Sequence, residues 1–300
     1  MPQSIVRNIE PKEIEFLPKN LQEWTSGFVE APGTANILSS RAFDPTGCFV
    51  ADNKGSIVGC VAVTNLPRKN WLVIRYLAAR HALSRVEAVE KLLGRALEYV
   101  ETKKPEFFRA TTPSMQPYVD VYKSFGFKPL RRDFRITWNL SEASELPNKQ
   151  VEIKEVNEET AREVADVYVR AIRPYWDWRT EEHGGEEAVA RTFLEGLQKG
   201  ERWISGSVGK EVVGLTGLIP DYYTTGEARF RGTFVVPKHR GRGIGQTMMS
   251  EASNWARKLA QRKMTVYTFS YLECLAPGAL LYIKSGGKIE SEYLQMQRAV

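Results

Sequence analysis

The fold of this chain is decided by the stretch Val235-Val236-Pro237-Lys238-His239-Arg240-Gly241-Arg242-Gly243-Ile244-Gly245-Gln246. A strand ends at the proline, a basic and glycine-rich turn follows, and apolar residues then recur at helical spacing from Ile244 onward. The glycines permit backbone conformations that are closed to other residues, and they leave no side chains in the way of a ligand. Because the first N–H groups of a helix lack partners and its dipole favours an anion, we expect this turn to bind a phosphate or pyrophosphate.

Two common nucleotide-binding patterns are absent from this stretch. Its glycines alternate as G-x-G-x-G, which differs from the dinucleotide fingerprint G-x-G-x-x-G, and no G-x-x-x-x-G-K-[ST] run occurs. The pattern V-x-P-x-x-R-G-x-G-I-G instead resembles motif A of the GNAT superfamily of N-acetyltransferases. The core of that motif, [RQ]-x-x-G-x-[GA], falls on Arg240, Gly243 and Gly245.

The resemblance implies that acetyl-CoA is the acyl donor and that the reaction uses no metal. It assigns the pyrophosphate to the turn and the start of the helix. It assigns the pantetheine arm, and a backbone donor near the thioester oxygen, to the strand before the proline. The residues expected to bind the cofactor are therefore Phe234, Val235, Val236, Arg240, Gly241, Arg242, Gly243, Ile244, Gly245 and Gln246.

Length and composition favour a soluble protein of two domains, since 300 residues is long for one domain and a hydrophobic fraction of 42% suits globular cores. No apolar run approaches the roughly 20 residues of a membrane span, and the N-terminus lacks a signal-peptide core. The cysteines Cys48, Cys60 and Cys274 are far apart and odd in number, so we expect a reducing, cytoplasmic location. The three histidines show no metal-ligand spacing, and we expect no zinc site.

The net charge of +6 is unevenly distributed. Residues 1–150 carry most of the excess of Lys and Arg, although the phosphate-binding turn lies in the other half. A basic surface can attract nucleic acid or another acidic partner. Because the excess is modest and its densest pairs, Lys103-Lys104 and Arg131-Arg132, are short, we expect an ordinary surface, with a nucleic-acid-associated protein as an alternative.

Internal repeats indicate duplicated domains. Residues 57–61 (IVGCV) parallel 212–216 (VVGLT), and 122–128 (YKSFGFK) parallel 282–288 (YIKSGGK), where the family has L-Y-x-K-x-G-F. We therefore predict a degenerate GNAT-like domain at 1–140, a polar linker at 141–150 and an acetyl-CoA-binding GNAT domain at 151–300. The resemblance implies the α+β fold class, in which each domain is a mixed, mostly antiparallel sheet flanked by helices.

The two halves are not equivalent. In the first half the stretch at the position of the phosphate-binding turn is Ala79-Arg80-His81-Ala82-Leu83-Ser84-Arg85-Val86, which has no glycine. Side chains would fill the space that a pyrophosphate needs, so we expect that the first half does not bind acetyl-CoA in the usual way. We expect it instead to pack on the second half and to shape the acceptor pocket. Residues 127–140, which close this half, are expected to form a terminal pair of strands.

Candidate catalytic residues follow from the resemblance. Tyr282 matches the family's tyrosine, a neutral phenol at pH 7 that can protonate the departing thiolate. Glu227 is the candidate base for the acceptor amine, with Asp221 as its rival, and either can also be a turn carboxylate. Tyr122 matches Tyr282 in the first half but has no cofactor turn to serve. Cys274 has no neighbouring histidine that would make it an acyl-carrying nucleophile.

The acceptor side is expected between two helices, at 159–173 and about 185–199. The connection contains aromatic and acidic side chains that can hold a cationic amine or pack the domains together: Tyr175, Trp176, Asp177 and Trp178. The acceptor can be a protein N-terminus, a polyamine, an amino sugar or an amino acid. The chain is expected to be a monomer or a homodimer. The predicted function is a soluble N-acetyltransferase acting by direct attack of the amine, with a non-catalytic acyl-CoA sensor as the other alternative.

Overall fold

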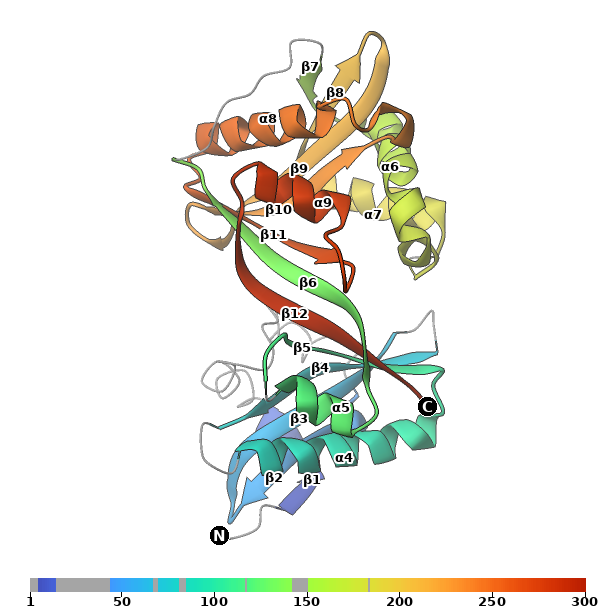
Figure 1. Ribbon diagram of the computed structural model, residues 1–300, viewed down its shortest axis with the longest axis vertical. Coiled ribbons are helices and arrows are strands. Elements are labelled where there is room, and N and C mark those ends of the chain that lie inside the picture. The colour runs from blue at the N-terminus through green and yellow to red at the C-terminus, as the bar shows by residue number, and fades with distance from the viewer. Residues whose placement is uncertain are drawn as a thin grey trace. The chain divides into compact units, whose positions relative to one another are not determined.

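The computed structural model describes residues 5–14, 44–66, 70–80, 85–116, 118–141, 151–182 and 184–300. The chain divides into two compact units: unit 1 comprises Met1–Asp133 and Glu292–Val300, and unit 2 comprises Phe134–Ser291. Each unit is a mixed sheet with helices packed on it, as Figure 1 shows. This confirms the expected fold class. No helix among the described residues is long and apolar enough to cross a membrane.

Unit 1 has the strand order β1-β2-β3-β4-β5-β12, in which only β4 and β5 run parallel among the pairs with a described register. Helices α4 and α5 pack on one core that includes Leu77, Leu92, Phe108 and Tyr122. The strands are β1 (Ile5–Asn8), β2 (Cys48–Asn53), β3 (Ser56–Leu66), β4 (Trp71–Ala79) and β5 (Phe107–Pro113). The helices are α1 (Pro11–Ile14), η1 (Pro45–Gly47), α4 (Arg85–Lys103) and α5 (Tyr118–Ser124).

Unit 2 has the strand order β6-β11-β10-β9-β8-β7, with β10 and β11 parallel. One hydrophobic cluster joins α8 and α9 to the sheet, and another joins α6 and α7 to it. The strands are β7 (Glu152–Glu155), β8 (Arg202–Val208), β9 (Glu211–Thr224), β10 (Glu227–Val235) and β11 (Lys263–Ser270). The helices are α6 (Ala161–Glu182), α7 (Glu186–Gln198), η2 (Pro237–His239), α8 (Ile244–Lys258) and α9 (Pro277–Lys284).

Two strands are shared between the units. Strand β6 (Lys128–Asn139) begins in unit 1 and ends in unit 2, whereas β12 (Lys288–Ala299) begins in unit 2 and ends in unit 1. Residues of β12 from Tyr293 onward pair with β5, and Met296 is fully buried in the core of unit 1. The compact units therefore divide at residues 133/134 and 291/292, which differs from the predicted boundaries. The predicted linker lies outside the described residues except for Ser141.

The expected pair of strands at 127–140 is wrong, because these residues form the single strand β6. Its second half supplies Phe134, Ile136 and Trp138 to the core of unit 2. Both halves of the chain end in similar alternating strands, and such a pattern predicts a strand without saying which sheet it joins.

Trp138 and Ile136 also explain why a glycine stands at 287 where the family has phenylalanine. A Cβ at Gly287 would lie 2.6 Å from Ile136 Cγ2, 2.8 Å from the Tyr282 carbonyl oxygen and 2.9 Å from Trp138 Cε2. We expect Gly287→Ala to lower the free energy of unfolding by about 1–3 kcal/mol, because the core would be overpacked. Urea titration measures this. The control is Gly94→Ala in α4, where a Cβ would only touch Phe125 at 3.8 Å, and where unfolding free energy should not fall. Equal behaviour of the two variants would contradict the prediction.

Candidate functional site

The site is built where two parallel strands of unit 2 separate. Strands β10 and β11 pair only at Glu227–Lys263, Ala228–Met264 and Arg229–Thr265, although they continue to Val235 and Ser270. On its other edge β10 stays paired with β9, with an irregularity between Phe230 and Gly232. The φ of 114° at Gly232 is one that residues with a side chain rarely adopt. The sheet is therefore open on the β11 side of β10 at a position fixed by this bulge.

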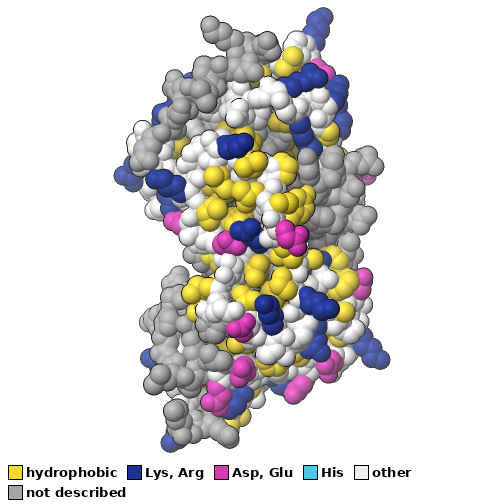
Figure 2. Space-filling view, in the orientation of Figure 1, with side chains coloured by type: hydrophobic (Ala, Val, Ile, Leu, Met, Phe, Trp, Pro, Cys, Tyr) yellow, Lys and Arg dark blue, Asp and Glu magenta, His cyan; other side chains and the backbone are white. Residues whose placement is uncertain are grey.

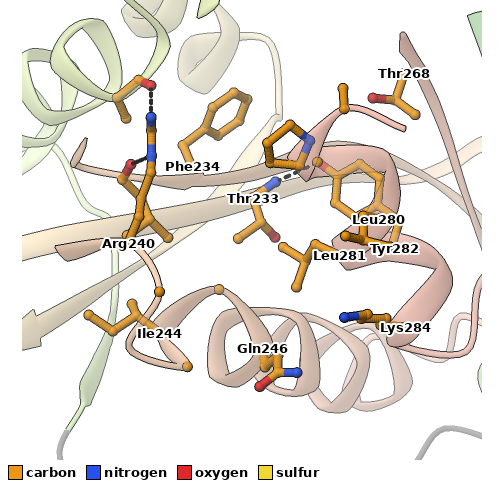
Figure 3. Close-up of a pocket in the computed structure, with 18 of the residues that line it drawn as sticks. Thr233, Phe234, Arg240, Ile244, Gln246, Thr268, Leu280, Leu281, Tyr282 and Lys284 are labelled. Carbon is orange, nitrogen blue, oxygen red and sulfur yellow. Dashed lines mark hydrogen bonds between the residues drawn. The ribbon is translucent and has the colours of Figure 1, made fainter. Parts of the chain in front are cut away.

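A cavity of about 450 Å³ lies at this opening, between the end of β10, the start of α8, the end of β11 and α9. Figure 3 shows the residues around it. The cofactor-binding residues predicted from sequence that line it are Phe234, Val235, Arg240, Gly241, Gly243, Ile244, Gly245 and Gln246. Val236 and Arg242 are not in its lining; Val236 is buried in the cluster under α6, and Arg242 is exposed beside the turn.

The glycine-rich turn leaves the start of α8 open. Gly241 and Gly243 have φ values of 75° and 78°, and Gly243 caps the helix with no side-chain hydrogen bond. The first helical bond runs from the Thr247 N–H to the Gly243 carbonyl, so the preceding N–H groups of the first turn lack helical acceptors. A Cβ at Gly241 would meet nothing within 4 Å. These residues fit the pyrophosphate of an acyl-CoA.

Three cations of the turn have different surroundings. Arg240 points inward and donates from Nε to the Val235 carbonyl at 2.9 Å and from Nη2 to the Ala171 carbonyl at 2.6 Å. Lys238 forms an ion pair of 2.7 Å with Glu211. Arg242 is exposed and has no ion pair with the residues that the structure describes. Arg240 therefore ties the turn to β10 and α6, and Arg242 is the cation available to a phosphate.

We expect substitutions of Arg240 and Arg242 to have different effects on stability and on acetyl-CoA binding. Arg240→Gln should lower the free energy of unfolding by about 1.5–3 kcal/mol, because it removes charged hydrogen bonds to two carbonyl groups. Arg242→Gln should change it by less than about 0.5 kcal/mol, because the side chain is exposed. Arg242→Gln should instead weaken acetyl-CoA binding about tenfold at low salt and less at high salt. Denaturant titration and calorimetry measure both, and loss of stability in Arg242→Gln alone would refute the assignment.

Tyr282 lies at the bulge of β10. Its side chain is 5% exposed and packs edge-on against Trp138 and Phe230, with ring centroids 5.7 Å away in each case. Its hydroxyl accepts a hydrogen bond of 3.1 Å from the backbone N–H of Thr233 (Figure 3). Burial raises the pKa of Tyr282 to about 12, and the Thr233 hydrogen bond partly offsets this. The phenol is thus neutral at physiological pH with its proton free to be donated.

The ladder between β10 and β9 fixes which peptide groups face the opening. Val236 N–H donates to the Val213 carbonyl at 2.9 Å. In an antiparallel ladder, successive residues point their backbone N–H and C=O alternately toward and away from the neighbouring strand. The N–H and C=O of Val235 and of Thr233 therefore point away from β9, toward the opening. The Val235 carbonyl is taken by Arg240, and its N–H remains on that side. Of the three residues predicted to offer a backbone donor, Val235 is the one whose N–H is so directed.

The structure does not support Glu227 as the base. Its carboxylate accepts a hydrogen bond of 2.9 Å from Thr265 and lies 3.4 Å from the Lys263 ammonium. It stands six residues before Thr233, about 20 Å along the strand. Asp221 caps a turn, where it accepts from the Gly226 N–H at 2.6 Å. The sequence placed these acids before the strand that leads into the turn, but it could not show that their partners are Thr265, Lys263 and Gly226.

Cys274 lies in the loop before α9 and is not among the residues that line this cavity. Ser270, which the sequence did not single out, organises this loop: its hydroxyl donates to the Cys274 carbonyl at 2.8 Å and accepts from the Ala276 N–H at 2.7 Å.

Figure 2 shows hydrophobic side chains gathered on the face of unit 2 that carries α9. Leu280 of α9 is 40% exposed and also lines the cavity.

A smaller cavity of about 120 Å³ adjoins the first. It lies between α6, β10 and β11, and the two cavities share Phe234, Thr268 and Tyr282 in their linings. The other residues that line it are Tyr168, Ile172, Arg229, Phe230, Arg231, Gly232, Val266 and Tyr267. Tyr282 thus stands at the junction of a large and a small cavity.

Residues 173–182 form the end of helix α6 and do not form a connection between helices, which corrects the sequence-based expectation. The first of the two helices was expected to end at residue 173, yet the backbone continues as a helix through the proline at 174 to Glu182. The side chains predicted to bind the acceptor, Tyr175, Trp176, Asp177 and Trp178, lie outside the part of the chain whose side chains the structure describes.

Sequence reasoning missed Thr233, Thr268 and Lys284, which all line the larger cavity. Lys284 is exposed at its edge in the Y-x-K motif, and its place two residues after Tyr282 was the available signal. Thr233 acts through its backbone, which a side-chain pattern does not reveal. Among the described residues, no group of three or more His, Cys, Asp or Glu side chains is placed to hold a metal ion.

Unit 1 has a similar separation of its two parallel strands. Strands β4 and β5 pair only from Trp71–Phe107 to Val73–Arg109. Tyr122, the counterpart of Tyr282, is fully buried, and its hydroxyl has no hydrogen-bond partner among the described residues. Its contacts are those of a packed core residue, including Phe127 with ring centroids 5.4 Å away. The stretch 81–84, where a phosphate-binding turn was predicted to be missing, lies outside the described residues.

Comparison with known proteins places this geometry in context. Residues 166–272 match the model of the acetyltransferase (GNAT) family. No curated protein matches the chain by sequence. A GCN5-related N-acetyltransferase from Sphaerobacter thermophilus is similar in structure, with a TM-score of 0.72 at 14% identity over 99% of this chain and 95% of that one. A tandem GNAT protein from the clavulanic acid biosynthesis pathway gives 0.65 at 15% identity over 99% and 98%. A GNAT-family acetyltransferase from Colwellia psychrerythraea gives 0.59 at 11% identity over 99% and 100%.

Proposed function

We propose that this chain, a member of the GNAT superfamily with two GNAT-like halves in tandem, is an acetyl-CoA-dependent N-acetyltransferase whose active site lies in unit 2. The family and the tandem layout support acetyl transfer in general. The choice of an amine acceptor and of unit 2 is our own proposal, and it rests on the arrangement around Tyr282.

The observation that carries the proposal is the position of the Tyr282 hydroxyl. It is held by the Thr233 N–H at the junction of the two cavities, close to where β10 and β11 separate. The larger cavity ends at the open start of α8 and suits the cofactor. The smaller cavity opens beside α6 and suits the acceptor. The reacting atoms would then meet at Phe234, Thr268 and Tyr282.

In this arrangement acetyl-CoA supplies an acetyl group activated as a thioester. The acceptor amine forms a bond to the carbonyl carbon, and the carbon–sulfur bond breaks. The Val235 N–H is the donor placed to stabilise charge on the carbonyl oxygen. Tyr282 donates its proton to the departing sulfur, and the proton lost by the amine passes to water, which restores the phenol. A protonated Tyr282 is present throughout the physiological range because its pKa is raised to about 12.

Two measurements test this function. Calorimetric titration should give one acetyl-CoA site per chain, because Tyr122 of unit 1 is a packed core residue whose hydroxyl has no partner among the described residues. Mass spectrometry of a panel of amines, alcohols and thiols incubated with acetyl-CoA should show acetylation of amines. Two sites per chain would refute the assignment to unit 2 alone. Acetylation of thiols or alcohols without amines would refute N-acetylation, and absence of binding would refute the whole proposal.

A further inference from the structure

The smaller cavity carries an excess of positive charge in its described lining. Arg229 and Arg231 both line it, and no Asp or Glu does so among the residues whose side chains the structure describes. Along β10 these arginines alternate with the buried Ala228 and Phe230, so they lie on one face of the strand. That face bears on the cavity, beside Tyr168 and Ile172 of α6.

The charge of Arg231 is already balanced. Its Nε donates to Glu201 Oε2 at 3.1 Å, and both side chains are largely buried. Glu201 also accepts from Trp203 Nε1 at 3.3 Å. This ion pair therefore has a structural role in the cavity wall. Removing either partner would leave the other charge poorly solvated.

Arg229 differs from Arg231 in that no ion pair joins it to a carboxylate of the described residues. Its Nη1 donates to the Tyr222 hydroxyl at 2.9 Å, and its guanidinium carbon lies 4.9 Å from the centre of the Tyr222 ring. Within the described part of the chain no acid lies within ion-pair distance of it. A guanidinium carries five N–H donors, so most of its fork stays available to a ligand. Tyr222 holds this cation in place through a neutral contact that does not neutralise it.

We propose that the acceptor is a small primary amine that also carries a carboxylate, and that Arg229 binds this carboxylate. The inference rests on the proposed function, which places the acceptor in this cavity. The planar fork of an arginine matches the two oxygens of a carboxylate. Arg229 stands four residues before Thr233, about 13 Å along the strand. The carboxylate and the amine are therefore separated by several bonds in an extended molecule and are not attached to one carbon atom.

The test uses straight-chain ω-amino carboxylates from glycine to 6-aminohexanoate, each paired with its uncharged carboxamide. With acetyl-CoA saturating, kcat/KM for a longer carboxylate should exceed that for its carboxamide about 10- to 100-fold, which is the size of a charged hydrogen-bonded contact. Arg229→Gln should abolish this preference, and Arg229→Lys should keep part of it. Arg202→Gln, at the exposed start of β8, is the matched control and should leave the preference unchanged.

Direct calorimetric titration of the same compounds separates this inference from the proposed function, because it needs no turnover. Binding of carboxylates, lost in Arg229→Gln with acetyl-CoA binding intact, supports the inference. Carboxamides that bind and react as well as carboxylates overturn it and leave the N-acetyltransferase function standing. Carboxylate binding without acetyl transfer would overturn the proposed function instead. Absence of binding by every carboxylate tested would overturn the inference.

Discussion

Tyr282→Phe is expected to lower kcat for acetyl transfer about 10²- to 10⁴-fold, the usual worth of a positioned general acid. The phenyl ring keeps its packing against Trp138 and Phe230, so the cavity walls should be preserved. The acetyl-CoA dissociation constant should change less than about threefold, because the hydroxyl acts on the leaving sulfur and not on the ground state. Stopped-time assays of free thiol, with calorimetry on the same samples, measure both quantities.

The matched control for this variant is Tyr122→Phe, in the corresponding motif of unit 1. The Tyr122 hydroxyl is buried without a described partner, so its removal should leave activity unchanged and stability equal or slightly higher. Full activity of Tyr282→Phe would refute the general-acid role. If wild-type protein binds acetyl-CoA but acetylates no amine, the chain is better described as a non-catalytic acyl-CoA sensor.

Gly245→Glu is expected to weaken acetyl-CoA binding by about 100-fold, because a carboxylate at the start of α8 would repel the pyrophosphate. The glutamate carboxylate would occupy the free N–H groups at the start of α8, where the pyrophosphate is expected to bind. A side chain at 245 also meets Leu281, since a Cβ there would lie 3.1 Å from Leu281 Cδ2. Both effects act at the larger cavity, which Gly245 and Leu281 line.

Gly245→Gln separates the two effects, because glutamine has nearly the same size as glutamate and no charge. We expect it to weaken binding several-fold through the contact with Leu281 alone. The difference between the two variants should shrink at high salt if charge is the cause. Equal dissociation constants for the Glu and Gln variants would mean that the start of α8 is not the anion site.

Much of the fold could be predicted from local pattern. The turn at 237–243, the helix after it and the hairpin of β8 and β9 follow from glycine, proline and alternation, which act over a few residues. The motif at Tyr282 likewise identified the residue that stands at the cavity junction. The end of α6 was not predicted, because a proline lowers the expectation of helix and packing can override it.

Local sequence patterns are enough to establish that a basic, glycine-rich turn precedes an amphipathic helix and that the chain contains a repeated unit. These are local properties, set by backbone sterics and residue spacing. Only the tertiary structure shows that β6 and β12 each run from one unit into the other. It also shows that Arg240 donates to two carbonyl groups and that Glu227 bonds to Thr265, far from Tyr282. It also brought Arg229 and Tyr282 into the lining of the same cavity. Such relations depend on contacts between distant segments, whose geometry no spacing along the chain specifies.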